Sequence, residues 1–155
     1  MQGNPKVIAQ LQTLLTGELS AVDQYLIHSR KYEDLGYLRL YEKTDHEMGE
    51  EREHADRLIR RMLFLEAVPD VAARDPLQIG EDVSAMLRND LALEYKVVQD
   101  LRTAMACCEA EGDYQSREIL QGLLTDTEED HAWWLERQLR LIDQIGLENY
   151  LQSQI

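Results

Sequence analysis

The sequence predicts an all-α protein: a four-helix bundle with a long crossover between its second and third helices and a short fifth helix at the C-terminal end. Three observations carry this prediction. Apolar residues recur at steps of three and four, no stretch alternates with period two, and only 8 Gly and 3 Pro interrupt 155 residues. This length suits one domain with its own core, so we expect a single domain over residues 1–155.

Turn residues divide the chain into four helical stretches of roughly 30 residues, each about 45 Å long. Pro5 occupies a first-turn position of the first stretch, and Gly36 is a typical residue to end it. The expected helices run from residue 5 to 36, from 37 to 67, from 81 to 112 and from 113 to 145, with a short amphipathic tail after Gly146. A long link at 68–80 between two short turns indicates a crossover between two antiparallel helix pairs.

The chain is strongly acidic, with 16 Lys and Arg against 30 Asp and Glu and a formal net charge of −14. Such a charge repels phosphate backbones, which argues against nucleic acid as a partner, and it attracts cations. No apolar run reaches the ~18 residues of a membrane span, and the N-terminus lacks the layout of a signal peptide. Cys107 and Cys108 are adjacent within a helical pattern, which is typical of buried thiols in a reducing compartment. We therefore expect a cytoplasmic protein.

Each expected helix carries one glutamate inside its apolar stripe. Isolated buried carboxylates are costly, so four of them in one core need a shared partner. Two of the four are followed by a histidine three residues on, which places both side chains on one helix face about one turn apart. The complete set is Glu18, Glu51, His54, Glu94, Glu128 and His131.

The spacing of these residues repeats, with 33 residues from Glu18 to Glu51 and 34 from Glu94 to Glu128. Two hairpins of the same plan, packed with pseudo-twofold symmetry, would bring all six side chains together at mid-bundle. Four carboxylates would then neutralise two divalent cations. Oxygen-rich ligation with one imidazole per metal suits iron or manganese, with zinc as a competitor. A single Glu-x-x-His is weak support, but the whole constellation predicts a dinuclear metal site.

Over nearly its full length the sequence resembles the bacterioferritins, within the ferritin-like di-iron proteins. The segments that carry the resemblance include DQYLIHSR in the first helix, EREHADRLIRRMLFLE in the second, and TEEDHAWWLERQLRLIDQIGLENYLQSQI in the fourth helix and tail. The resemblance implies a ferroxidase that oxidises Fe(II) with O2 or H2O2, two iron ions per subunit and a 24-subunit shell holding ferric mineral. It also implies that Glu51 and Glu128 bridge the irons, while Glu18, His54, Glu94 and His131 are terminal ligands.

One position departs from the family pattern. The resemblance places a haem b between two subunits, held by a methionine directly after the second-helix glutamate. Here that residue is Arg52, which offers donors and no lone pair. Met48, a weaker alternative, lies about 6 Å back along the helix. We expect no haem in a shell of this chain alone. A mixed shell with a haem-binding paralogue, and release of iron through a ferredoxin partner, stay open.

Three further residues carry smaller predictions. Tyr25 lies seven residues beyond Glu18 on the same stripe. It would hydrogen-bond a ligand carboxylate or supply an electron, and a plain core tyrosine explains it equally well. For His46 and Glu50 the resemblance implies an iron site on the inner surface of the shell, and a solvated acidic face is an equal explanation.

Two other functions fit parts of the pattern. A di-iron peroxidase or oxidase that does not mineralise would use the same ligands, although a rubrerythrin would need more cysteines than the adjacent pair. A structural shell subunit would oxidise no iron. The miniature ferritins place their ligands between two subunits, whereas all six residues here lie in one chain.

Overall fold

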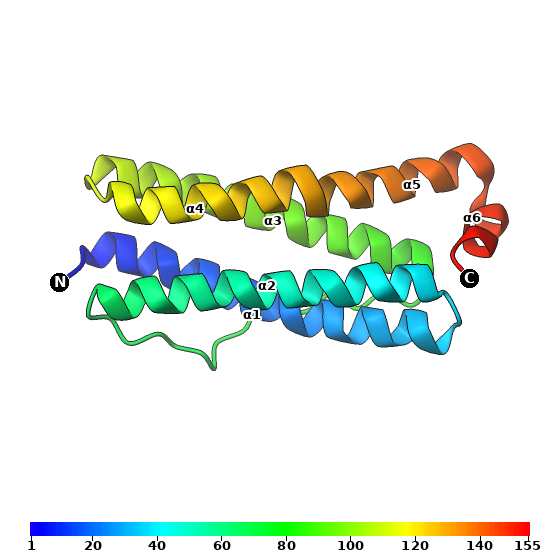
Figure 1. Ribbon diagram of the computed structural model, residues 1–155, viewed down its shortest axis with the longest axis horizontal. Coiled ribbons are helices and arrows are strands. Elements are labelled where there is room, and N and C mark those ends of the chain that lie inside the picture. The colour runs from blue at the N-terminus through cyan, green and yellow to red at the C-terminus, as the bar shows by residue number, and fades with distance from the viewer.

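A computed structural model describes all 155 residues and shows two antiparallel helix pairs packed side by side (Figure 1). The first pair is α1 (Pro5–Asp34) with α2 (Leu38–Phe64). The second pair is α3 (Val83–Ala110) with a long fourth helix. That helix consists of α4 (Tyr114–Asp126), a π-helical segment η1 (Thr127–Ala132) and α5 (Trp133–Ile145). The short α6 (Leu147–Ser153) turns across one end of the bundle, as Figure 1 shows. This architecture confirms the predicted fold class.

The helices begin and end at capping residues and glycines that can be recognised in the sequence. The side chain of Asn4 caps α1, with Pro5 at the first helical position, and Asp113 caps α4 by accepting from the backbone N–H of Ser116. The breaks near Gly36 and Gly146 have φ angles of 83° and 82°, a backbone conformation that favours glycine.

The crossover between α2 and α3 carries the chain along the length of the bundle, lying against α1 (Figure 1). Three side chains of α1 fasten it by accepting backbone N–H groups. Ser20 accepts the N–H of Asp75 at 2.8 Å, Gln24 accepts that of Gln78 at 3.0 Å, and His28 accepts that of Gly80 at 3.0 Å. These contacts satisfy donors that an irregular segment would otherwise leave unpaired.

Two apolar clusters fill the ends of the bundle. The larger contains Leu11, Leu58, Leu101 and Leu120, and the smaller is built around Tyr32 and residues of α3, α5 and α6. Buried polar side chains occupy the interior that these two clusters leave between them. The polar middle of the bundle is where the candidate site forms.

The fourth helix departs from the predicted stripe at η1. A π-helical segment accommodates one extra residue per turn, so it shifts the faces of the helix by one position. Thr127 is fully buried and takes the inward place expected of Glu128, whose side chain is 36% exposed. His131 and Leu135 are buried as predicted. The predicted placement of Glu128 on the apolar stripe is therefore wrong, because that stripe assumed uninterrupted α-helical spacing.

Candidate metal centre

Five of the six predicted ligands meet at the middle of the bundle, and each is at most 1% exposed. Every long helix contributes at least one of them: α1, α2, α3 and the π-helical segment of the fourth. The five residues are Glu18, Glu51, His54, Glu94 and His131.

These residues form two groups that share Glu51. One group joins Glu51 to Glu18 and His54, and the other joins it to Glu94 and His131, with the ligand atoms of each group within 4.8 Å of one another. The two carboxylate oxygens of Glu51 face different rings. Oε2 lies 3.1 Å from Nδ1 of His54, and Oε1 lies 2.7 Å from Nδ1 of His131. A carboxylate placed in this way can bridge two metal ions.

Burial and close contacts shift the pKa values of the groups in this centre. Burial raises the pKa of Glu18 well above its usual range and that of Glu94 to about 7. Burial opposes the ionised form of Glu51 as well, but its close contacts with Glu18 and with the two histidines hold its pKa below the usual range. Burial alone would lower the pKa of His54, yet the neighbouring carboxylates of Glu18 and Glu51 raise it to about 11. Metal ions would replace the protons of these groups, since ligand atoms must be deprotonated to bind.

Several carboxylate oxygens in the centre have no hydrogen-bond partner although they are buried. They are both oxygens of Glu18 and Oε2 of Glu94. Buried polar atoms are normally paired, so a cluster of orphaned acceptors fits the binding of cations. Their oxygen and imidazole chemistry fits iron or manganese.

Tyr25 is buried beside the centre, and its hydroxyl group donates a hydrogen bond to Glu94. Burial, together with the charges of Glu94 and Asp90, raises the pKa of Tyr25 well above its usual range. The phenol therefore stays protonated and available to donate to this carboxylate.

Glu128, the sixth predicted ligand, is not brought to the cluster. Its carboxylate accepts a hydrogen bond from Arg102 on α3, at the surface of the bundle. The extra residue of η1 accounts for this placement, because it turns Glu128 away from the face that carries His131.

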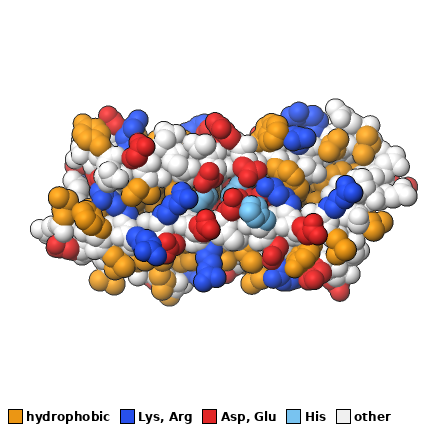
Figure 2. Space-filling view, viewed as in Figure 1, with side chains coloured by type: hydrophobic (Ala, Val, Ile, Leu, Met, Phe, Trp, Pro, Cys, Tyr) orange, Lys and Arg blue, Asp and Glu red, His pale blue; other side chains and the backbone are white.

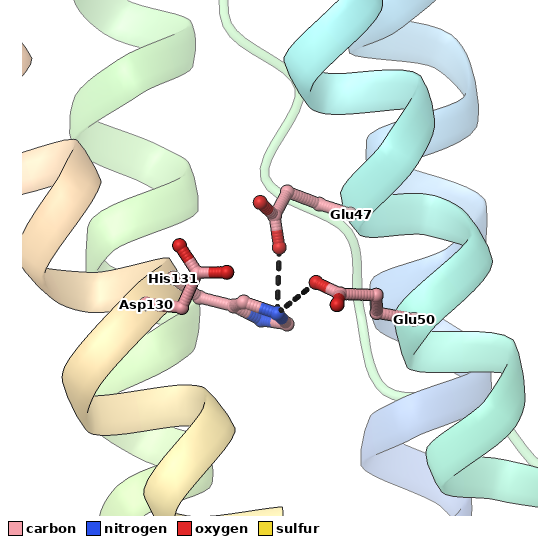
Figure 3. A group of neighbouring side chains, drawn as sticks. All are labelled: Glu47, Glu50, Asp130 and His131. Atoms are coloured by element: carbon pink, nitrogen blue, oxygen red, sulfur yellow. Dashed lines mark hydrogen bonds and ion pairs between the residues drawn. The ribbon is translucent and has the colours of Figure 1, made fainter.

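A second acidic group lies against the outer side of His131 (Figure 3). Nε2 of His131 is 2.6 Å from Glu47 and 2.9 Å from Glu50, and Asp130 lies close to both. Lys43 pairs with Glu47 and lies 3.1 Å from Asp130, so an ammonium group already occupies part of this site. Figure 2 shows acidic side chains gathered around exposed histidine atoms at the middle of this face.

Sequence analysis predicted only part of this second acidic group. Glu50 belongs to it, whereas His46 is 66% exposed and lies 3.5 Å from Glu50 at its edge. Glu47 was missed, although its position four residues before Glu51 places it on the same helix face. Asp130 could not be found in this way, because its direction depends on the π-helical turn.

The positions that bear on haem lie on α2. Arg52 is exposed and Met48 is partly buried. Neither belongs to any of the acidic and histidine groups described above.

Comparison with known proteins identifies the family. The family model of the ferritin-like domain matches residues 8–145. The chain belongs to the ferritin-like family. It is 57% identical over its whole length to bacterial ferritins of Synechocystis and of Pseudomonas aeruginosa, covering 99% and 100% of those chains. It is 43% identical to a bacterioferritin of Brucella melitensis, covering 98% of this chain and 94% of that one.

These similarities confirm a bacterioferritin-type protein and support a role in iron storage. The ferritin-like family binds iron, and the centre described above offers buried carboxylate and histidine groups that could hold it. No helix is both long and apolar enough to cross a membrane.

Proposed function

We propose that this protein is a ferroxidase that oxidises Fe(II) at the buried centre and deposits ferric mineral inside a shell of 24 copies. The observation that carries the proposal is the position of Glu51 between two Glu and His pairs. Two Fe(II) ions are the substrate, one on each side of Glu51, and each gives one electron. With H2O2, two Fe(II) and two protons yield two Fe(III) and two waters; with O2 the same electrons yield H2O2.

The residues of the chain divide this work between them. Glu18 and His54 would hold one iron, and Glu94 and His131 the other, while Glu51 spans both. Tyr25 donates to Glu94 and so limits the directions that this carboxylate can take. Burial removes competing water from the ligands, which strengthens their interaction with the charged ions.

The charge balance of the centre involves its neighbours. Three carboxylates with neutral histidines carry −3 against +4 for two Fe(II). On the far side of His131, three carboxylates and one ammonium group add a net charge of −2; they belong to Glu47, Glu50, Asp130 and Lys43. This second group would attract iron that leaves the centre. We therefore extend the proposal to an iron site there and at His46, on the surface of the shell that faces the mineral.

We propose further that a shell of this chain alone binds no haem b, because Arg52 stands where the family places the ligating methionine. A mixed shell that also contains a haem-binding paralogue would bind haem through that paralogue. Release of iron through a ferredoxin partner would depend on that haem. Both cysteines are free thiols, and Cys108 is fully buried, which supports the proposal of a reducing cytoplasm.

Stopped-flow absorbance during aerobic Fe(II) addition tests the proposal. We expect a fast phase that saturates at two Fe(II) per chain, followed by slower growth of the signal as mineral forms. Glu51→Gln should abolish the fast phase. Glu53→Gln is the matched control, since Glu53 is exposed on the same helix and does not belong to the centre.

Three results would contradict parts of this function. Saturation at two iron ions without further growth would indicate a di-iron oxidase or peroxidase that does not mineralise. Oxidation no faster than in protein-free buffer would indicate a structural subunit. A particle far smaller than 24 chains by light scattering would contradict the shell.

A further inference from the structure

The ring of His54 is held from both sides. Its Nδ1 faces the centre, 3.1 Å from Glu51 and 3.8 Å from Glu18. Its Nε2 faces the opposite way and lies 3.1 Å from Oδ2 of Asp126. Asp126 lies outside the set of metal ligands that the family pattern indicates, and sequence analysis did not single it out.

Asp126 connects the buried ring to the surface. It is the last residue of α4, directly before the π-helical turn. Its side chain is 45% exposed, whereas that of His54 is 2% exposed. The carboxylate therefore stays hydrated while one oxygen reaches inward to the ring, so it avoids the cost of a fully buried charge.

A neutral imidazole has one N–H group and one lone pair, on different nitrogens. A carboxylate beside Nε2 favours a proton on that nitrogen. When a metal ion displaces the proton of Nδ1, the lone pair of Nδ1 is then directed into the site beside Glu18 and Glu51. Metal-bound histidines commonly donate their second N–H to such a carboxylate, and removing it typically weakens metal binding by about 10- to 100-fold.

We propose that Asp126 is a positioning residue of the metal centre: it orients His54 so that Nδ1, and not Nε2, binds the metal. This role rests on the proposed function of the centre. On the other side of the site, Nε2 of His131 faces both Glu47 and Glu50, so two carboxylates share the same task there. Asp126 is the single partner of Nε2 in His54, and one substitution therefore removes the whole effect.

Zinc binding tests this role without any oxidation reaction. Zn(II) affinity would be measured by competition with a chromophoric chelator for the wild type, Asp126→Ala and Asp126→Asn. Glu129→Ala is the matched control, because it removes one negative charge from an exposed neighbouring position. Crystals of the zinc-loaded proteins would show which ring nitrogen of His54 faces the metal.

We expect Asp126→Ala to weaken zinc binding at His54 by about 10- to 100-fold and to release the ring from its Nδ1-bound orientation. Asp126→Asn keeps an accepting oxygen, so it should retain the ring orientation with a smaller loss of affinity. Glu129→Ala should match the wild type. If Asp126→Ala binds zinc as tightly as Glu129→Ala with Nδ1 still on the metal, the positioning role is wrong and the centre stands. A wild-type protein with no zinc at His54 would overturn the centre and, with it, this role.

Discussion

Replacing His28 by alanine should detach the crossover from the bundle and destabilise the protein. The His28 ring is fully buried between two elements. Its Nδ1 lies 2.8 Å from Asp90 on α3, and its Nε2 accepts the backbone N–H of Gly80 at 3.0 Å. Because Nε2 must accept, the proton lies on Nδ1, which donates to Asp90.

The substitution would leave the buried N–H of Gly80 without a partner, whereas Oδ1 of Asp90 would keep the hydrogen bond that Gln24 donates to it at 2.8 Å. Such an orphan costs about 1–3 kcal/mol, so the unfolding free energy should fall by about 1–3 kcal/mol, and the hydrogen bond lost by Asp90 and the empty space left by the ring add to this loss. For a chain of this size, about 2–4 °C of melting temperature is lost per kcal/mol. The melting temperature should therefore fall by at least about 2 °C.

Thermal and urea unfolding followed by circular dichroism, at one fixed protein concentration, measures this change. His46→Ala is the control, because the side chain of His46 is 66% exposed and exposed substitutions usually stay within about 0.5 kcal/mol of the wild type. A His28→Ala protein as stable as His46→Ala would refute the argument that this ring anchors the crossover.

Three other predictions follow from the same contacts. Lys43→Met should raise the number or affinity of Co(II) ions bound per chain under anaerobic calorimetry, since it frees Glu47 from its ammonium partner; an unchanged isotherm would contradict this. Burial opposes ionisation of Asp113, but hydrogen bonds from Ser116 and the charge of Arg61 lower its pKa below the ordinary 3.8. The ionised Asp113 therefore contributes fully to stability above pH 3.8, and this contribution is lost as the pH falls through the lower pKa of the folded state. Asp113→Asn should reduce the fall of the melting temperature at acid pH. An unchanged fall would contradict the pairing of Asp113 with Ser116 and Arg61. The wild-type protein mixed with haem b should show no shifted Soret band, and Arg52→Met should gain one; a band in the wild type would show that another ligand is in use.

The main divisions of this fold could be predicted from the sequence because they rest on local chemistry. Gly36 and Gly146 end helices through positive φ angles, which few other residues adopt. Glu18 and Glu94 were found because a charged residue inside an apolar stripe is conspicuous. Periodicity was enough to place these side chains in the interior.

Features that depend on contacts between distant parts of the chain could not be predicted. The π-helical turn changes the local repeat, so Glu128 faces Arg102 although its spacing to His131 suggested otherwise. The role of Asp126 could not be predicted either, since its contact with His54 joins two helices, α4 and α2, that are distant in the sequence. The fastening of Gly80 to α1 involves a backbone N–H group, which carries no signal in the sequence.

Anomalous diffraction at the iron edge, from crystals soaked anaerobically in Fe(II), tests the central claim most directly. The arrangement predicts two peaks, one on each side of Glu51, the first beside Glu18 and His54 and the second beside Glu94 and His131. A protein with iron only at the group around Glu47, or with no iron near Glu51, would contradict the assignment of this centre.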